Sequence, residues 1–158
     1  LAAEKAGWSR DPGPNRGLGI AFSYGHLGYV AHVARVVADG SKVKVEKVFS
    51  AVDVGPVLNL SGASNQVEGA VIDALSTAQL EMTFVDGAAR QSNFHNYRLL
   101  KINQAPDVEV HFIQSDNPPT GLGEPPFLAA GPAIANAIFA ATGTRIREMP
   151  FKRAGIII

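Results

Sequence analysis

The sequence predicts an α+β fold in which helices pack on a mixed β-sheet. Two patterns favour this class: period-two stretches in the first third of the chain and again near residue 110, and helical stripes between residues 67 and 142. The 158 residues are 46% hydrophobic and only 18% charged, which suits one domain with a substantial core and disfavours disorder.

The chain opens with a short helical segment, Leu1–Trp8, which Gly7 is expected to end. A strand follows over residues 18–24, where bulky residues alternate with small ones: Gly19, Ala21 and Ser23. A face of small residues permits the close approach of another backbone or of a ligand, and tight packing against a helix is the commoner explanation.

Two further strands are expected to form a hairpin. Residues 29–38 are apolar on both faces apart from His32 and Arg35, as in an interior strand. Asp39-Gly40 is a turn signal, and a strand over residues 42–52 returns from it, with a bulge expected after Lys47 because the alternation slips there.

The strongest helix pattern runs from Val67 to Met82 as one apolar stripe, with Asn65 as expected N-cap and Glu68 completing a capping box. A short hairpin over residues 83–90 and a half-exposed strand over residues 108–112 come next.

A second helix is expected over about Ala133–Thr142, because Pro132 suits a first helical position and Gly143 a position just past the end. The proline-rich and glycine-rich segment 116–126 before it is predicted to be a loop.

Composition excludes several classes of function. Fourteen basic residues balance fourteen acidic ones, which disfavours a nucleic-acid partner. The absence of cysteine excludes thiolate zinc sites, a cysteine nucleophile and a cysteine-ligated iron–sulfur cluster within the chain. No apolar run is expected to reach the length of a membrane span. Because the chain begins with Leu1 and a helix tail, we expect a fragment or a processed product.

Most polar candidates favour ordinary structural roles. His26, His32, His95 and His111 lack metal-ligand spacing and are expected to be surface or hydrogen-bonded histidines. Gly17-Leu18-Gly19 lacks the third glycine of a dinucleotide fingerprint, so nucleotide binding there is a distant possibility. The basic residues near the C-terminus are expected to form a solvated face: Arg145, Arg147, Lys152 and Arg153.

The segment Gly121-Leu122-Gly123-Glu124-Pro125-Pro126 is more specific. Gly123 removes a β-carbon before the carboxylate, and Pro125 is expected to restrict Glu124 to an extended backbone. An amide-rich helix N-terminus shortly afterwards would suit an anion. A rigid turn with the carboxylate in water is an equally good reading of the same spacing.

The start of the strong helix, Ser64–Gly69, is a second candidate. Free amides there could bind a phosphate or the polar edge of a cofactor. An ordinary helix cap is the favoured alternative.

Several motifs together resemble the molybdenum-cofactor subunit of the xanthine oxidase family, in the branch of the bacterial isoquinoline 1-oxidoreductase β subunit and its aldehyde-oxidising relatives. The resemblance covers nearly the whole chain, in order. The motifs that carry it are Ala51-Val52-Asp53-Val54-Gly55, Gln66-Val67-Glu68-Gly69, Gln91-Ser92-Asn93-Phe94-His95-Asn96-Tyr97, Gly121–Pro126, Pro132–Ile138 and Ala141-Thr142-Gly143.

This resemblance implies that residues 1–158 are a C-terminal segment of a molybdopterin-binding domain. It implies that Glu124 is the general base of a hydroxylase that inserts water-derived oxygen at an electron-poor carbon of an N-heterocycle or an aldehyde. Gln66 would hydrogen-bond the cofactor, while Gly121 and Gly123 would let the backbone close on the site. Leu122 stands where a smaller aliphatic residue is common.

The implied cofactor is molybdopterin with molybdenum, in bacteria usually as the cytosine dinucleotide. The implied partners are the rest of the subunit and an iron–sulfur subunit or domain. The sequence does not decide between the bacterial cytoplasm and the periplasm. We expect the isolated chain to be inactive. The alternative is a non-catalytic interaction or scaffold module that kept the fold.

Overall fold

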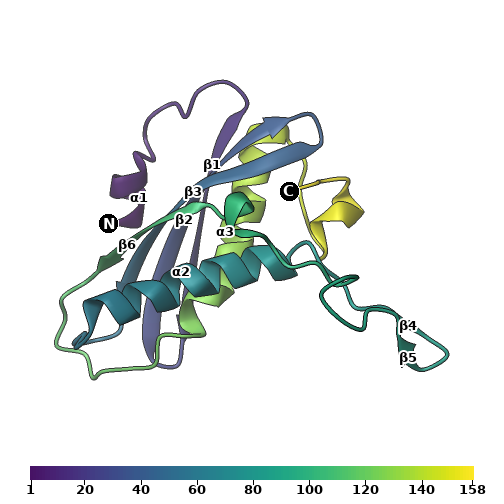
Figure 1. Cartoon of the computed structure of the whole chain (residues 1–158). Helices are drawn as coiled ribbons and strands as arrows, with labels where there is room; N and C mark the ends of the chain where they lie inside the picture. Colours follow the sequence, from purple (N-terminus) through teal and green to yellow (C-terminus); the bar gives the residue numbers. More distant parts are fainter.

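A computed structural model describes all residues from Leu1 to Ile158 and confirms the α+β class, with two long helices on a mixed sheet (Figure 1). The strand order is β1-β2-β3-β6, antiparallel except for the parallel pair of β3 and β6, and β4 and β5 form a separate hairpin. The elements are α1 (Ala2–Ala6), β1 (Arg16–Gly25), β2 (Gly28–Asp39), β3 (Lys42–Asp53), α2 (Leu60–Thr77), β4 (Phe84–Val85), β5 (Ala88–Ala89), η1 (Ile102–Gln104), β6 (Asp107–Phe112), α3 (Pro125–Thr142) and η2 (Phe151–Ala154).

The hydrophobic core lies between one face of the sheet and the crossed helices α2 and α3 (Figure 1). Alternate residues of β2, such as Ala34 and Val36, meet Leu75 of α2 and Ile134 of α3 there, all fully buried. The opposite face of the sheet is covered only in part, by α1, which packs on Val33 and its neighbours. The two long helices, α2 and α3, therefore both pack on the same face of the sheet.

The small face of β1 is the one that receives α3. A β-carbon added to Gly19 would lie 2.0 Å from the Ala137 backbone nitrogen, and one added to Gly17 would lie 2.2 Å from the Ala137 carbonyl oxygen. Backbone therefore packs on backbone, and the expectation of tight packing against a helix is confirmed. The bulky face of β1 is the exposed one, with Phe22 and Tyr24 more than half accessible.

The hairpin of β2 and β3 forms as expected. Gly40 supplies the positive φ of its turn, and the register shifts where Arg35 and Val36 of β2 face Lys47 and Val45 of β3. Glu46 is thus the extra residue, one position before the expected bulge. The Glu46 carboxylate accepts a hydrogen bond from Nε of Arg16 (3.1 Å), and this hydrogen bond holds the pKa of Glu46 below its ordinary value.

The start of α2 differs from the sequence prediction. The helix begins at Leu60, and the N-cap is Asn59, whose side-chain oxygen accepts the Gly62 amide (2.9 Å). Asn65 therefore lies inside the helix. The apolar stripe marks only the part of the helix that reaches the core, and the exposed first turn before Val67 lacks that signal.

The start of α3 was also predicted too late. The helix begins with Pro125 and Pro126, and Pro132 lies inside it, whereas Gly143 ends it with positive φ as expected. By length and composition α3 could cross a membrane, contrary to expectation, but half of it is buried in the fold. Such burial is typical of a core helix.

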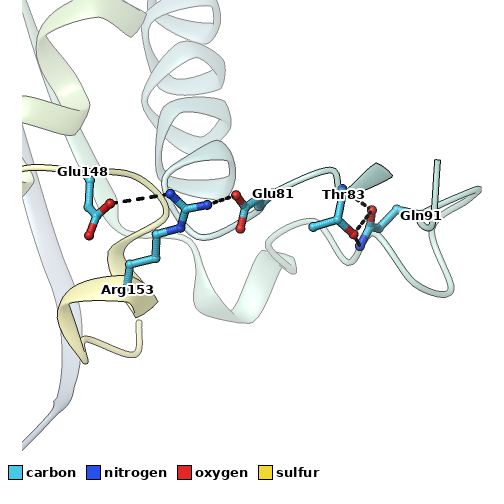
Figure 2. A network of polar contacts seen from close by, with 5 residues as sticks. All are labelled: Glu81, Thr83, Gln91, Glu148 and Arg153. Carbon is cyan, nitrogen blue, oxygen red and sulfur yellow. Dashed lines mark hydrogen bonds and ion pairs between the residues drawn. The ribbon is translucent and has the colours of Figure 1, made fainter. Parts of the chain in front are cut away.

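Part of the segment between α2 and β6 extends from the body as an arm that ends in the β4–β5 hairpin (Figure 1), and the segment then returns to the body, where Leu100 packs on the core. Figure 2 shows how the base of the arm is held: Arg153 of η2 pairs with Glu81 and, at 3.5 Å, with Glu148. Beyond it, the Thr83 amide donates to the Gln91 side chain (2.7 Å). The basic residues near the C-terminus are exposed, as expected, and Arg153 among them forms ion pairs.

We predict that Gly19→Ala lowers the free energy of unfolding by about 3 kcal/mol or more, because the new methyl group meets helix backbone that has no rotamer to change. Urea denaturation of the chain measures this. Gly69→Ala is the matched control: nothing lies within 4 Å of its added β-carbon in α2, and the change should stabilise by up to about 1 kcal/mol. Equal stability of the two variants would contradict the packing argument.

Candidate functional site

The candidate site is the loop of residues 113–124, which connects β6 to α3. Asp53 at the end of β3 holds its first half: the carboxylate accepts the Ser115 hydroxyl (2.5 Å) and the Asn117 side-chain amide (2.9 Å). Gly55 lies against this segment, where a β-carbon would be 2.4 Å from the Asn117 carbonyl oxygen. The loop is thus fixed to the sheet by its first residues.

The second half of the loop is fixed by backbone pairing and by one apolar side chain. The Thr120 amide donates to the Val54 carbonyl oxygen (3.0 Å). Leu122 packs on the small cluster of Val30, Val52, Val54 and Val67. Leu122, which lies between Gly121 and Gly123, therefore anchors the loop on this cluster. This packing accounts for a leucine where a smaller aliphatic residue is common in the family that the sequence resembles.

Glu124 occupies the N-cap position of α3, but its backbone is helical (φ −85°, ψ −41°) and its side chain caps no amide. The expected extended backbone was wrong: a following proline disfavours the helical region without forbidding it, and the Phe127 amide closes a turn on the Glu124 carbonyl oxygen (2.9 Å). The expected amide-rich helix end was also wrong, because Pro125 and Pro126 have no N–H.

The two prolines fix where α3 starts. The Ser23 hydroxyl of β1 donates to the Pro125 carbonyl oxygen (3.1 Å), and His32 of β2 contacts the Pro126 carbonyl oxygen through Nε2 (2.7 Å). Side chains of two strands thus hold the first turn of the helix, and Glu124 directly precedes it.

The tautomer of His32 follows from its partners. A carbonyl oxygen can only accept, so Nε2 carries the proton, and Nδ1 accepts the Ser50 hydroxyl (2.8 Å). Burial lowers the pKa of His32 to about 4. The ring is therefore neutral at pH 7 and acts as a fixed donor below the helix start.

Glu124 has one side-chain partner, His26, whose Nε2 lies 2.9 Å from Oε2. His26 is at the tip of the turn between β1 and β2, and it and Leu27 both have positive φ (52° and 66°). The analysis of the sequence missed this pair. Gly25 and Gly28, which frame a two-residue turn between alternating strands, were the available signal.

Gln66 lies in the exposed part of α2, next to the loop. A β-carbon on Gly123 would be 3.5 Å from Gln66 Oε1, and the Gln66 side chain has no hydrogen bond within the chain. Around Gly121 there is open space. Gln66 therefore lies beside Gly123, the residue that directly precedes Glu124. The amides at Ser64–Gly69 are internal to α2, which removes the possible binding of a phosphate by free amides there; the helix cap that was the favoured interpretation lies earlier, at Asn59.

The remaining candidates keep structural roles. His32 and His111 are hydrogen-bonded and His95 is exposed, as expected, and no group of three or more His, Asp or Glu side chains could hold a metal ion. The backbone of α3 fills the space beside Gly17 and Gly19, which leaves no room for a nucleotide.

The site is open to solvent in this chain. The side chains of Glu124 and His26 are 77% and 58% exposed. A cavity of about 680 Å³ lies elsewhere, between α1 and the sheet, where Arg10 and Arg16 are among its lining residues. Any ligand at Glu124 would therefore lie on a surface of this chain.

Comparisons with known proteins agree with the fold. The model of the molybdopterin cofactor-binding domain matches residues 3–106. The β subunit of isoquinoline 1-oxidoreductase from Brevundimonas diminuta is 35% identical over 96% of this chain and 20% of its own length. A membrane-bound aldehyde dehydrogenase [pyrroloquinoline-quinone] from Gluconacetobacter polyoxogenes is 36% identical over 98% and 21%.

Among solved structures, quinoline 2-oxidoreductase from Pseudomonas putida 86 superimposes with a TM-score of 0.71 at 22% identity, over 78% of this chain and 17% of that one. The fold is thus that of a molybdenum-hydroxylase domain. The chain belongs to the molybdopterin cofactor-binding domain family of xanthine oxidase-type enzymes. It spans about a fifth of the length of the curated relatives named above.

We predict that the stability of the chain falls as the pH drops from about 6.5 to about 4, by roughly 3 kcal/mol in total through His32 alone. In this range the unfolded chain binds a proton that the folded chain does not, so acid favours unfolding. Denaturation of wild type and His32→Gln across this range measures the difference. His95→Gln is the control, which should keep the wild-type slope, and an identical slope in His32→Gln would contradict the assignment.

Proposed function

We propose that this chain is part of a molybdenum-dependent oxidoreductase that inserts water-derived oxygen at an electron-poor carbon of an N-heterocycle or an aldehyde, with Glu124 as general base. The two substrate classes follow from the names of the two curated relatives. One observation supports the proposal: Gln66 Oε1 lies 3.5 Å from where a β-carbon on Gly123 would be, and Gly123 directly precedes Glu124.

The side chains available at this surface suit the polar edge of a cofactor. Gln66 offers both a donor and an acceptor, and neither is used within the chain. Gly121 and Gly123 leave backbone without side chains beside it. We propose that Gln66 hydrogen-bonds molybdopterin in its cytosine dinucleotide form, and that the two glycines permit close approach.

The carboxylate of Glu124 is available for proton transfer because it does not cap the helix that follows it. Its one side-chain partner is His26, whose Nε2 lies 2.9 Å from Oε2. The carboxylate would accept a proton from the water that supplies the oxygen. The bound cofactor would supply the redox centre for the two electrons that leave the substrate carbon.

Electrons must then leave the site through other groups. Cysteine is absent from this chain, so iron–sulfur clusters would belong to a partner subunit or another domain. The absence of a cluster of potential metal ligands fits a metal that is held by its cofactor.

A second candidate is a non-catalytic interaction module with the same fold. The exposure of Glu124 favours it, because an isolated carboxylate in water has no catalytic advantage. The two candidates differ in what the loss of the carboxylate does to turnover.

We predict that Glu124→Gln in the full-length enzyme lowers kcat by about 10²–10⁴-fold while molybdenum content is retained, because the amide cannot accept the proton. Steady-state turnover of isoquinoline and of an aldehyde, together with metal analysis, measures this. Glu4→Gln on α1 is the matched control and should be neutral. Turnover within tenfold of wild type, with cofactor retained, would remove Glu124 as the base and favour the non-catalytic module.

We predict that the isolated chain binds no stoichiometric molybdenum and is inactive, because Gln66 and Glu124 lie on an open surface that cannot exclude water. Metal analysis of the purified chain after expression in a molybdopterin-producing host measures this. One molybdenum per chain would show that these residues hold the cofactor by themselves.

A further inference from the structure

We infer that His32 is a positioning residue for Glu124: its hydrogen bond to the Pro126 carbonyl oxygen fixes the start of α3 and, with it, the backbone that carries the carboxylate. Since it concerns the same carboxylate, this role depends on the proposed function. It gives a part in the reaction to a buried titratable residue of β2 that lies 94 positions before Pro126 in the sequence.

His32 and Ser50 form a polar pair inside an otherwise apolar part of the core. They lie directly opposite each other on β2 and β3, and both are fully buried. The only other buried polar side chain is that of Ser76. A buried polar group costs free energy unless it is hydrogen-bonded, and an apolar pair of similar shape can be nearly as stable. Stability alone therefore explains the pair poorly, whereas its directional contacts are something that apolar side chains would not provide.

Both ring nitrogens of His32 are hydrogen-bonded. Nε2 lies 2.7 Å from the Pro126 carbonyl oxygen, and Nδ1 lies 2.8 Å from the Ser50 hydroxyl oxygen. Burial lowers the pKa of His32 to about 4, so the ring is neutral at pH 7 and its one proton is on Nε2. Because the side chain is wholly buried, water cannot take the place of the Pro126 contact.

The two prolines transmit this contact to Glu124. A proline ring fixes φ, so only ψ angles can rotate between the α-carbon of Glu124 and the Pro126 carbonyl group. The prolines have no N–H and the Glu124 side chain caps no amide, so the usual capping bonds do not hold this helix start. The part-buried Ser23 hydroxyl, which donates to the Pro125 carbonyl oxygen (3.1 Å), is the second side-chain contact from the sheet.

The strand that carries His32 is a rigid support for this contact. β2 is an interior strand, paired along its length with β1 and β3. Val30 and Ala34, which lie on the same face on either side of His32, are also fully buried. The ring therefore cannot move aside without disturbing the packed core, and the helix start keeps its distance from the sheet.

Glutamine and asparagine at position 32 separate positioning from stability. In His32→Gln the amide nitrogen can take the place of Nε2 and reach Pro126, whereas in His32→Asn the shorter amide can take only the place of Nδ1. Both variants bury one amide at the same position, so their polarity is matched. Val33→Ala is the control for lost packing, because Val33 is fully buried in the same strand but packs on the opposite face, beside α1.

The kinetic test uses the full-length, cofactor-containing enzyme with isoquinoline and acetaldehyde as probes and a dye as electron acceptor. We expect His32→Asn to lower kcat by about tenfold or more with KM changed less than about twofold, because a small displacement of a reacting group slows the chemical step. His32→Gln and Val33→Ala should keep kcat within about threefold of wild type. A wild-type kcat in His32→Asn, or an equal loss in His32→Gln or in Val33→Ala, would overturn the inference.

Hydrogen exchange of the same enzymes, followed by mass spectrometry, gives a readout that is independent of turnover. Phe127 is the first residue of α3 with an amide, and that amide donates to the Glu124 carbonyl oxygen (2.9 Å). We expect the peptide with Phe127 and Leu128 to exchange faster in His32→Asn than in wild type, His32→Gln or Val33→Ala, at unchanged molybdenum content. Unchanged exchange in His32→Asn would contradict the assignment. If Glu124→Gln keeps full turnover, the proposed base is wrong, and the exchange rates still decide whether His32 fixes the helix start.

Discussion

The contact of α3 with β1 is the constraint on which the rest of the structure depends. Because Gly17 and Gly19 have no side chains, the helix backbone rests directly on the strand. At such a distance a helix cannot slide or rotate without backbone collision, so its position along β1 is determined. The first turn is then held by Ser23 and His32, which place Glu124 at one edge of the sheet.

This constraint explains why a carboxylate at a helix start is not used as a cap. In an ordinary helix an acidic N-cap accepts a free amide. Here Pro125 and Pro126 remove the first amides, and the backbone of Glu124 is already helical. The side chain is therefore released toward the turn of β1 and β2, where the imidazole of His26 meets it. The same prolines that make the helix end a poor anion site thus make its carboxylate available for chemistry.

The sequence predicted the sheet better than the helix starts, and the reason is physical. Alternation reports directly which strand residues face the core, so β1, the β2–β3 hairpin and β6 were found nearly in place. The first turns of a helix are often exposed and lack an apolar stripe. For this reason the sequence pattern did not reveal that α2 begins at Leu60. Pro132 resembles a first helical position but is tolerated inside α3. The pairing of His26 with Glu124 depends on how the sheet places a distant turn, and no local pattern contains that information.

The exposure of the candidate site to solvent determines how strongly its charged side chains interact. An exposed imidazole–carboxylate pair contributes little to stability in water, because solvent screens it. The same pair interacts more strongly once water is removed, since the effective dielectric constant falls. Glu124 of the loop and His26 of the turn meet at this surface, and Gln66 of α2 lies beside Gly123, with no bulky side chain on Gly121 or Gly123 to separate them from a covering group. The family to which the chain belongs is described as a molybdopterin cofactor-binding domain, and molybdopterin is the covering group that we propose for this surface.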